Sequence, residues 1–263
     1  LGAGKPIVIC VLDWTGLLNT AHLRWRQTLA EAAGTTPDRV AVQCVHQHNA
    51  PFACLDAQAI VDAQGDLPDI IDPDFFDRCL VTAHEQVRAC LKRSSPVTHI
   101  AHGQAPVKKI AGNRRIIGLD GKVLTQRGSS STKPEHHQYP EGLIDPMLKT
   151  VTFYNGDRAL LASHYYACHP MSYYGDGRVS ADFCGLARRQ RQAQKPECTH
   201  LYFNGCGGNI GAGKYNNGSK QARKTLTNRL LQGIIASEAS MTREPIKSVN
   251  WATQEILPPL NQT

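Results

Sequence analysis

An apolar run near the start of the sequence, Ile7–Leu12, constrains the fold more than any other stretch. It shows no alternation of polar and apolar residues, which is typical of a strand buried on both faces of a parallel sheet. A helix capped by Asn19 or Thr20 ends before Gly34, and a second buried strand includes residues 40–42 and runs out at His46. A strand, a helix and a strand of these lengths predict a parallel βαβ unit. With the later hairpin they predict an α/β fold, with a mixed β-sheet core flanked by helices.

The rest of the sequence contains no internal repeat and no clear linker. It therefore predicts a single domain over residues 1–263, apparently truncated from a longer protein at both ends. The remaining elements are predicted as a loop at 52–73, a helix capped by Asp72, a strand at 97–105, a long loop or hairpin at 113–139, a hairpin around Asn155-Gly156-Asp157, a helix at 182–194, a strand at 201–203, a helix capped by Ser219 and running to 239, and a last strand at 246–255.

The distribution of charge argues against nucleic-acid binding. The 263-residue chain has a formal net charge of +7 and a pI of about 9.0, but its basic residues lie in small scattered groups without interleaved aromatic residues. Such basic groups usually lie on solvated faces of helices. They are also compatible with attraction to an anionic substrate or a membrane surface. None of the nine cysteines forms a C-x-x-C pair, which disfavours a cysteine zinc site. No apolar run reaches the roughly 18 residues of a membrane span, and no pattern indicates an oligomeric state.

Two histidines, His46 and His48, follow the second predicted strand. In a strand, side chains two residues apart project from the same face, roughly 7 Å apart. Two imidazoles in this arrangement suit one metal ion, usually zinc. The alternative is a pair of half-exposed histidines at a strand end, before Asn49 and Pro51 turn the chain. The tandem histidines at 136–137 lie in a polar segment, where histidines are usually solvated.

A glycine-rich segment follows the predicted strand at 201–203. Gly208–Lys214 has the spacing G-x-x-x-x-G-K of a phosphate-binding loop, which would indicate a nucleotide-binding module. The next residue is Tyr215 rather than the Ser or Thr that binds magnesium, and residues 216–218 separate the lysine from the following helix. The glycines also suit a loop whose backbone N–H groups face an active site, or a tight bend without chemistry.

Four segments, in their order along the chain, resemble the neutral/alkaline, non-lysosomal ceramidases. They are the His-x-His-x-x-Pro segment, Asn113-Arg114-Arg115, the stretch His164–Pro170 with Val179–Phe183, and the glycine-rich loop at 204–216. The resemblance covers about residues 7–255. It implies the fold of that family's catalytic domain and the activity of a zinc amidase, which splits ceramide, a sphingolipid, into sphingosine and a fatty acid. It also implies an extracytoplasmic protein, periplasmic or secreted.

The resemblance implies a set of zinc ligands. Two of them are His46 and His48, and the third is His169 of the later His-Pro pair. The last two ligands of the family, a Glu and a Tyr, belong downstream of Pro259, beyond the end of this sequence. Three histidines and a water molecule already make a complete catalytic zinc site.

The resemblance also assigns roles to residues around the metal. Asn113 and Arg114 match an Asn-Arg pair beside the substrate, and a guanidinium is a fixed, charged donor that suits a developing oxyanion. Asn209 takes the place of an aspartate in the family's pattern and is a candidate catalytic residue. Gly207 and Gly208 are candidate substrate-binding residues through their backbone N–H groups.

The chain departs from the ceramidases at the nucleophile. Where the family has a serine, in the segment Gly-Asp-Val-Ser-Pro-Asn, this chain has Gly211. We therefore expect a water molecule activated by zinc to attack the substrate carbonyl directly. Asp13 and Asp182 are the candidate general bases, since they lie at a strand end and a helix start, and Asp182 is also a candidate substrate-binding residue.

These inferences favour a zinc-dependent hydrolase that acts on an amide, or an ester, in a lipid-like or acyl-amino substrate. Two other classes remain open: a relative that binds a ligand or lipid without turning it over, and a nucleotide-binding module that uses Gly208–Lys214. Bound metal without hydrolysis would indicate the first, and nucleotide-dependent stabilisation would indicate the second.

Overall fold

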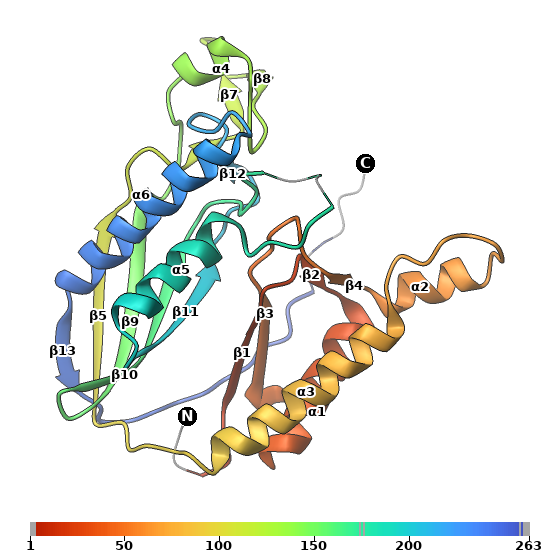
Figure 1. Ribbon diagram of the computed structural model, residues 1–263, viewed down its shortest axis with the longest axis vertical. Helices are drawn as coiled ribbons and strands as arrows, with labels where there is room; N and C mark the ends of the chain where they lie inside the picture. The colour runs from red at the N-terminus through yellow and green to blue at the C-terminus, as the bar shows by residue number, and fades with distance from the viewer. Residues whose placement is uncertain (1–3, 174, 176, 258, 260–263) are drawn as a thin grey trace.

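The elements of the chain form two packed units, one around a five-stranded sheet and one around a pair of parallel strands (Figure 1). The structure is a computed structural model that describes residues 4–173, 175, 177–257 and 259. Each unit has its own cluster of buried apolar side chains, and Val11 and Val45 of the smaller unit pack into the cluster of the larger one. The predicted α/β fold with a mixed sheet is confirmed.

The larger unit is built on the five-stranded sheet. Its strand order is β11 (Thr199–Asn204), β10 (Arg158–Tyr166), β9 (Met147–Asn155), β5 (His99–Pro106) and β13 (Thr242–Pro245). β10 and β11 are parallel, whereas the other neighbours are antiparallel. The predicted hairpin at Asn155-Gly156-Asp157 is confirmed, because it joins β9 to β10 and Gly156 supplies the positive φ of 57° that the turn requires.

Two helices cover one face of this sheet: α5 (Asp182–Gln194) and α6 (Lys220–Ala239) (Figure 1). Ser219 caps α6 as predicted, since its hydroxyl accepts a hydrogen bond from the Ala222 N–H at 3.1 Å. Leu226, Leu230 and Ile234 recur every four residues, and all three are fully buried in the core beneath the helix. In the described part of the chain, none of the helices has the length and apolar character that a membrane span needs.

The smaller unit is a parallel pair of strands packed on helices. β1 (Val8–Leu12) and β3 (Val40–Cys44) pair in parallel and are joined through α1 (Asn19–Ala33) and a 3₁₀ turn (Pro37–Arg39), so the predicted βαβ unit is confirmed. Trp25 and Leu29 of α1 share a core with Phe76 of α3 (Pro73–Leu91). β1 is not buried on both faces as predicted. Ile9 is 44% exposed, because β1 and β3 form a separate two-stranded sheet instead of the centre of a larger one.

The segment 52–73 is more regular than the predicted loop. It contains the short strand β4 (Phe52–Ala53) and the helix α2 (Leu55–Asp62). β4 pairs with β2 (Gly16–Leu17), a short strand just before α1. α2 supplies the cap of α1, because the Asp56 carboxylate accepts hydrogen bonds from the N–H and the hydroxyl of Thr20 at 3.0 and 2.7 Å. The N-cap position of α1 is Leu18, so the predicted side-chain cap at residue 19 or 20 is wrong. Asp72 caps α3 as predicted.

The region 112–139 contains a hairpin and a short helix, which project at one end of the molecule (Figure 1). The hairpin strands are β7 (Arg115–Ile117) and β8 (Val123–Gln126), and the helix is α4 (Pro134–Gln138). At the base of the hairpin, β6 (Gly112–Asn113) pairs with β12 (Ile210–Gly211). This pairing ties the base of the hairpin to the glycine-rich segment.

The predicted last strand, residues 246–255, is wrong. The final strand is β13, which pairs with the edge strand β5 so that Pro245 lies opposite His99. His99 is the first residue of β5, and the pairing continues beyond it only through the Ile246 N–H, which donates to the Thr98 carbonyl at 3.0 Å. Residues 246–257 have no regular structure.

Candidate metal centre

Three histidines meet where the two units adjoin. His46 and His48 follow β3, and His169 follows β10. The centroids of the three rings lie 4.9, 4.7 and 5.0 Å from one another, and one nitrogen of each ring lies within 4.8 Å of the others. The structure thus brings together residues that are 121 positions apart in the chain, in a group that could hold a metal ion.

His46 reaches this position through an unusual backbone conformation and not through a strand. β3 ends at Cys44, so the predicted alternation of His46 and His48 along one strand face is wrong. His46 has a φ of 76°, in the left-handed region that non-glycine residues rarely adopt, and its N–H donates to the Trp14 carbonyl at 2.9 Å. The turn brings the rings of His46 and His48 closer together than an extended strand would.

Backbone carbonyls fix the orientation of two of the rings. His46 Nδ1 lies 2.6 Å from the Thr15 carbonyl oxygen, and His169 Nδ1 lies 3.2 Å from the Gly207 carbonyl oxygen. A carbonyl only accepts, so each Nδ1 carries the proton and each Nε2 is left with a lone pair. His48 Nε2 is 2.9 Å from His169 Nε2, a hydrogen-bonding separation somewhat shorter than the roughly 3.3 Å between two nitrogens on a tetrahedral zinc ion, so a bound ion would require a small outward shift of the rings. A carbonyl behind a ligating imidazole is the usual outer partner in zinc sites, and the residues therefore fit the metal.

Burial favours the neutral imidazole, which a metal requires, at His48 and His169. Burial lowers the pKa of His169 to about 4, with the positive charge of Arg114 as a smaller cause. Burial likewise lowers the pKa of His48, assisted by His46 and Arg114. Since a metal ion binds the neutral imidazole, burial keeps His48 and His169 ready to take one at neutral pH.

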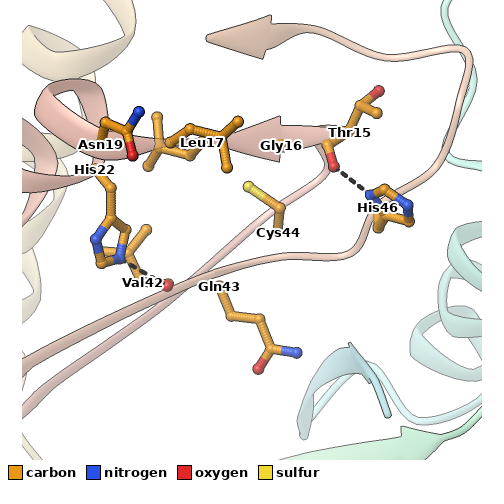
Figure 2. A pocket seen from close by; sticks show the side chains of 10 residues that line it. Thr15, Gly16, Leu17, Asn19, His22, Val42, Gln43, Cys44 and His46 are labelled. Carbon is orange, nitrogen blue, oxygen red and sulfur yellow. Dashed lines mark hydrogen bonds between the residues drawn. The ribbon is translucent and has the colours of Figure 1, made fainter. Parts of the chain in front are cut away.

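Thr15 organises the loop that carries the histidines, a role that no sequence pattern indicated. Its carbonyl accepts from the His46 ring, as Figure 2 shows, and its N–H donates to the Pro51 carbonyl at 2.7 Å. Its hydroxyl donates to the carbonyls of Gln47 and Ala50, at 2.6 and 3.0 Å. One residue of the β1–α1 connection thus holds both ends of the loop.

Arg114 and Ser129 lie beside Gly211, the position that the sequence resemblance aligned with the serine of the ceramidases. The guanidinium donates to the Ser129 hydroxyl at 2.7 Å and to the Gly208 carbonyl at 3.4 Å. A Cβ on Gly211 would lie 3.4 Å from both Arg114 Nε and Ser129 Oγ. Arg114 Nε is buried and has no hydrogen-bond partner among the described residues. The site therefore offers a cation with one unused donor and a buried hydroxyl, and Ser129 had no motif to reveal it.

The glycines of the predicted site have two different roles. Gly207 packs against the ligand loop, since a Cβ at this position would lie 3.2 Å from the His169 backbone nitrogen. Gly208 and Asn209 are exposed, and a Cβ on Gly208 would meet nothing within 4 Å. Gly207 therefore allows a close approach of two backbones, whereas Gly208 and Asn209 face open space beside Arg114.

Three predicted polar residues are engaged in bonds within the protein. The Asn113 side chain donates to the Leu143 carbonyl at 3.1 Å and accepts from the backbone at 2.9 Å. Asp182 is buried, and its carboxylate accepts from the N–H and the hydroxyl of Ser172. Asp13 is exposed and pairs with Arg188 at 3.5 Å. This geometry favours structural roles for Asn113 and Asp182, whereas Asp13 is held only by an exposed ion pair.

The glycine-rich segment is not arranged as a phosphate-binding loop. Gly211 lies in β12, and the Lys214 ammonium donates to the carbonyls of His137 and Tyr139. The following helix begins only at Lys220. A phosphate-binding loop needs a free lysine and the open N–H groups of a helix start, so this geometry argues against a nucleotide-binding module.

The tandem histidines are structural instead of solvated. His136 is buried, with Nδ1 at 2.9 Å from the Ser131 hydroxyl. His137 Nδ1 lies 2.7 Å from the Lys214 carbonyl oxygen. Both rings thus fasten α4 to the segments around it.

A second histidine pair, inside the larger unit, is explained by hydrogen bonding. His164 Nε2 lies 2.9 Å from His200 Nδ1. The angle between the two ring planes is 13°, and the ring centroids are 5.3 Å apart. Near-coplanar rings at this separation are joined end to end, so the N–H of one points at the lone pair of the other. Glu238 lies 3.8 and 3.7 Å from the two nitrogens and is held by Arg191. The pair therefore has the geometry of an N–H···N bond, and not of two lone pairs turned toward one ion.

Two open pockets adjoin the residues of the candidate centre. The first has a volume of about 390 Å³ and is lined by residues that include Leu17, Val42, Cys44 and His46 (Figure 2). The second has a volume of about 300 Å³ and is lined by residues that include Asn113, Ile117, Leu143 and Asn209. Space for a substrate is therefore present next to His46 and next to Asn209.

No protein-family model matches the sequence, and no curated protein matches it. Solved structures do match. A ceramidase complexed with C2 matches over 87% of this chain with a TM-score of 0.63 at 12% identity, and the neutral ceramidase from Pseudomonas aeruginosa matches over 87% with a TM-score of 0.60 at 16% identity. The chain has the ceramidase fold. The resemblance inferred from the sequence is thus confirmed at the level of the fold, and the chain spans about a third of the length of these ceramidases, 35% and 36%.

The first prediction concerns the ligands themselves. His48→Ala should lower the zinc content by about one ion per chain, because two imidazoles hold zinc far less tightly than three. The matched control is His102→Ala, since His102 is exposed and lies outside both histidine groups. Metal analysis after loading with zinc and dialysis measures the difference. A folded wild-type protein that retains no zinc would contradict the prediction.

The second prediction concerns Thr15. Thr15→Val keeps the shape of the side chain but leaves the carbonyls of Gln47 and Ala50 without their donor. The carbonyl that holds His46 Nδ1 belongs to the backbone and stays in place, so we expect zinc affinity to fall by about 10-fold, the lower end of the effect of losing an outer partner, whereas Thr15→Ser should stay close to the wild type. Competition with a chelator gives both affinities. Equal affinities for the Val variant and the wild type would show that Thr15 does not position the ligands.

Proposed function

We propose that this chain is a zinc-dependent hydrolase that cleaves an amide bond, or an ester bond, in a lipid-like or acyl-amino substrate. The convergence of His46, His48 and His169 carries the proposal, because three neutral imidazoles form a common donor set of catalytic zinc. The ceramidase fold and the two pockets beside the centre support it. Bound zinc would polarise the scissile carbonyl and acidify a water molecule.

The protein groups around the histidines keep them in a productive orientation. The carbonyls of Thr15 and Gly207 hold the Nδ1 protons of His46 and His169, so that both Nε2 lone pairs face the centre. No rotation of the rings is then required when substrate binds. Such preorganisation lowers the cost of reaching the transition state.

Arg114 is the proposed donor to the negative charge that develops on the carbonyl oxygen. Its two terminal guanidinium nitrogens donate to Ser129 and Gly208, and its Nε–H has no partner among the described residues. A buried donor without a partner is costly in the free protein and becomes satisfied when an oxyanion forms beside it. Its side chain also carries a fixed positive charge at any ordinary pH.

A water molecule is the proposed nucleophile, because Gly211 offers no side chain. The hydroxyl that could replace water is that of Ser129, which lies next to Gly211 and accepts a hydrogen bond from Arg114. The two routes differ in one observable: attack by Ser129 leaves an acyl group on the protein, whereas attack by water does not.

Binding without turnover is the second candidate function. It is favoured by the glycine at position 211 and by the hydrogen bonds that engage the buried carboxylate of Asp182. In this case the centre would hold metal and ligand but lack a group to transfer protons. The nucleotide-binding alternative has no comparable support, since Lys214 is already bonded to two carbonyls.

The third prediction tests the proposed function. The zinc-loaded chain, incubated with a panel of N-acyl sphingosines, N-acyl amino acids and the matching esters, should release a free fatty acid from at least one amide. His48→Ala should abolish this release and His102→Ala should not. The intact mass of the quenched protein should show no acyl adduct. Zinc binding with no hydrolysis across the panel would favour binding without turnover. An acyl adduct on Ser129 would show that Ser129, and not water, is the nucleophile.

The fourth prediction concerns Arg114. Arg114→Ala should lower kcat by about 100-fold or more, the scale for losing one oxyanion donor, with zinc content unchanged. Arg114→Lys should recover part of the lost kcat, since it restores the positive charge but not the planar guanidinium with its several N–H donors. The control is Arg93→Ala, because Arg93 is exposed beyond the end of α3. If Arg114→Ala turns over at the rate of the control, Arg114 has no part in catalysis.

A further inference from the structure

The β7–β8 hairpin exposes apolar side chains on both strands and at its turn. We call Ile117, Leu119, Val123 and Leu124 the apolar tip: Leu119 is fully exposed, and the other three are exposed by 56%, 47% and 59%. Outward positions of an antiparallel hairpin in water are normally polar. Single exposed apolar residues are ordinary, but four on one hairpin form a patch that indicates a contact.

The shape of the apolar tip limits what it can contact. The hairpin projects from the end of the molecule beyond α6 (Figure 1). A stable protein–protein interface buries about 1,200 Å² or more in total, and four side chains at a narrow turn offer only a fraction of that area. A lipid surface needs no matching shape, and a few apolar side chains that enter the boundary between headgroups and acyl chains suffice for reversible docking.

The charges around the apolar tip suit an anionic lipid surface. Arg115 and Lys122 are exposed on the hairpin, within a chain of net charge +7. The one acidic residue of the hairpin is Asp120, whose carboxylate accepts a hydrogen bond from the Lys122 N–H at 3.1 Å. Because a carboxylate is costly in the hydrocarbon, Asp120 would keep the turn at the level of the lipid headgroups.

A pocket links the apolar tip to the candidate metal centre. Ile117 and the exposed Leu143 line the pocket of about 300 Å³ that also contains Asn209. Asn209 follows Gly208, whose carbonyl accepts from Arg114. An acyl chain that leaves a lipid surface at the apolar tip would therefore meet a space lined by Ile116, Ile117 and Leu143, with Arg115, Asn113 and Asn209 also in its lining.

We propose that the apolar tip docks the protein on an anionic lipid surface, with its apolar side chains at the headgroup–acyl boundary and Lys122 at the phosphates. The pocket at the base of the hairpin then receives the acyl chain of the substrate. This second step rests on the proposed function, whereas docking itself requires no hydrolysis. Failure of docking and failure of catalysis are therefore distinguishable.

The test is flotation of the full chain with phosphatidylcholine vesicles, with and without phosphatidylserine. The wild type should bind the vesicles that contain phosphatidylserine more strongly, and Leu119→Ser combined with Leu124→Ser should lower that binding about tenfold. Both side chains are exposed, so the variant should fold. Ile60→Ser is the matched control, because Ile60 is 67% exposed on α2 and lies away from the hairpin. Lys122→Gln should weaken binding only where phosphatidylserine is present.

Two further measurements make the outcome decisive. The emission of Leu119→Trp should shift to shorter wavelength when vesicles are added, since the indole enters a less polar environment. The double serine variant should hydrolyse a soluble short-chain amide at the wild-type rate. Absence of vesicle binding by the wild type, or equal binding by the double variant, would overturn the proposal. So would self-association without lipid that the double variant abolishes, because a second copy of the chain would then be the partner.

Discussion

The hydrogen bonds of Thr15 hold together the part of the structure on which the candidate centre depends. The left-handed backbone of His46 costs roughly 1–3 kcal/mol, and such a conformation persists only where its surroundings fix it. Thr15 provides this through its N–H, its hydroxyl and its carbonyl, which bind the loop between His46 and Pro51 at several points. The carbonyl also fixes the tautomer of His46, so the same residue that stabilises the strained loop prepares the ring for a metal.

The centre depends equally on close contact between two units that have separate cores. Gln43 donates to the Asn204 carbonyl at 2.9 Å, and the Ser180 N–H donates to the Asn49 carbonyl at 2.7 Å. Because two histidines come from one unit and His169 comes from the other, any opening between the units would separate the ligands. The metal would in turn stabilise this contact, since its ligands bridge both units.

The local patterns of the sequence were sufficient for most helices and for the strands that pair with close neighbours. The caps at Asp72 and Ser219 and the turn at Gly156 are each specified within a few residues. The H-x-H motif indicated His46 and His48, and the family resemblance indicated His169. The strand geometry predicted for His46 was wrong, because its left-handed turn is set by bonds to Thr15, 31 residues away. Ser129 and the capping role of Asp56 depend on contacts across the fold, and no local pattern could reveal them.

The central claim is that histidines, and not the cysteines of this chain, hold a zinc ion. The structure describes all nine cysteines as free thiols, and two of them, Cys90 and Cys206, are exposed, so zinc content alone would not identify the ligands. X-ray absorption at the zinc edge of the loaded protein tests the claim most directly. We predict a shell of nitrogen and oxygen atoms at about 2.0–2.1 Å with the scattering pattern of imidazole rings, whereas a sulfur shell at about 2.3 Å would contradict it.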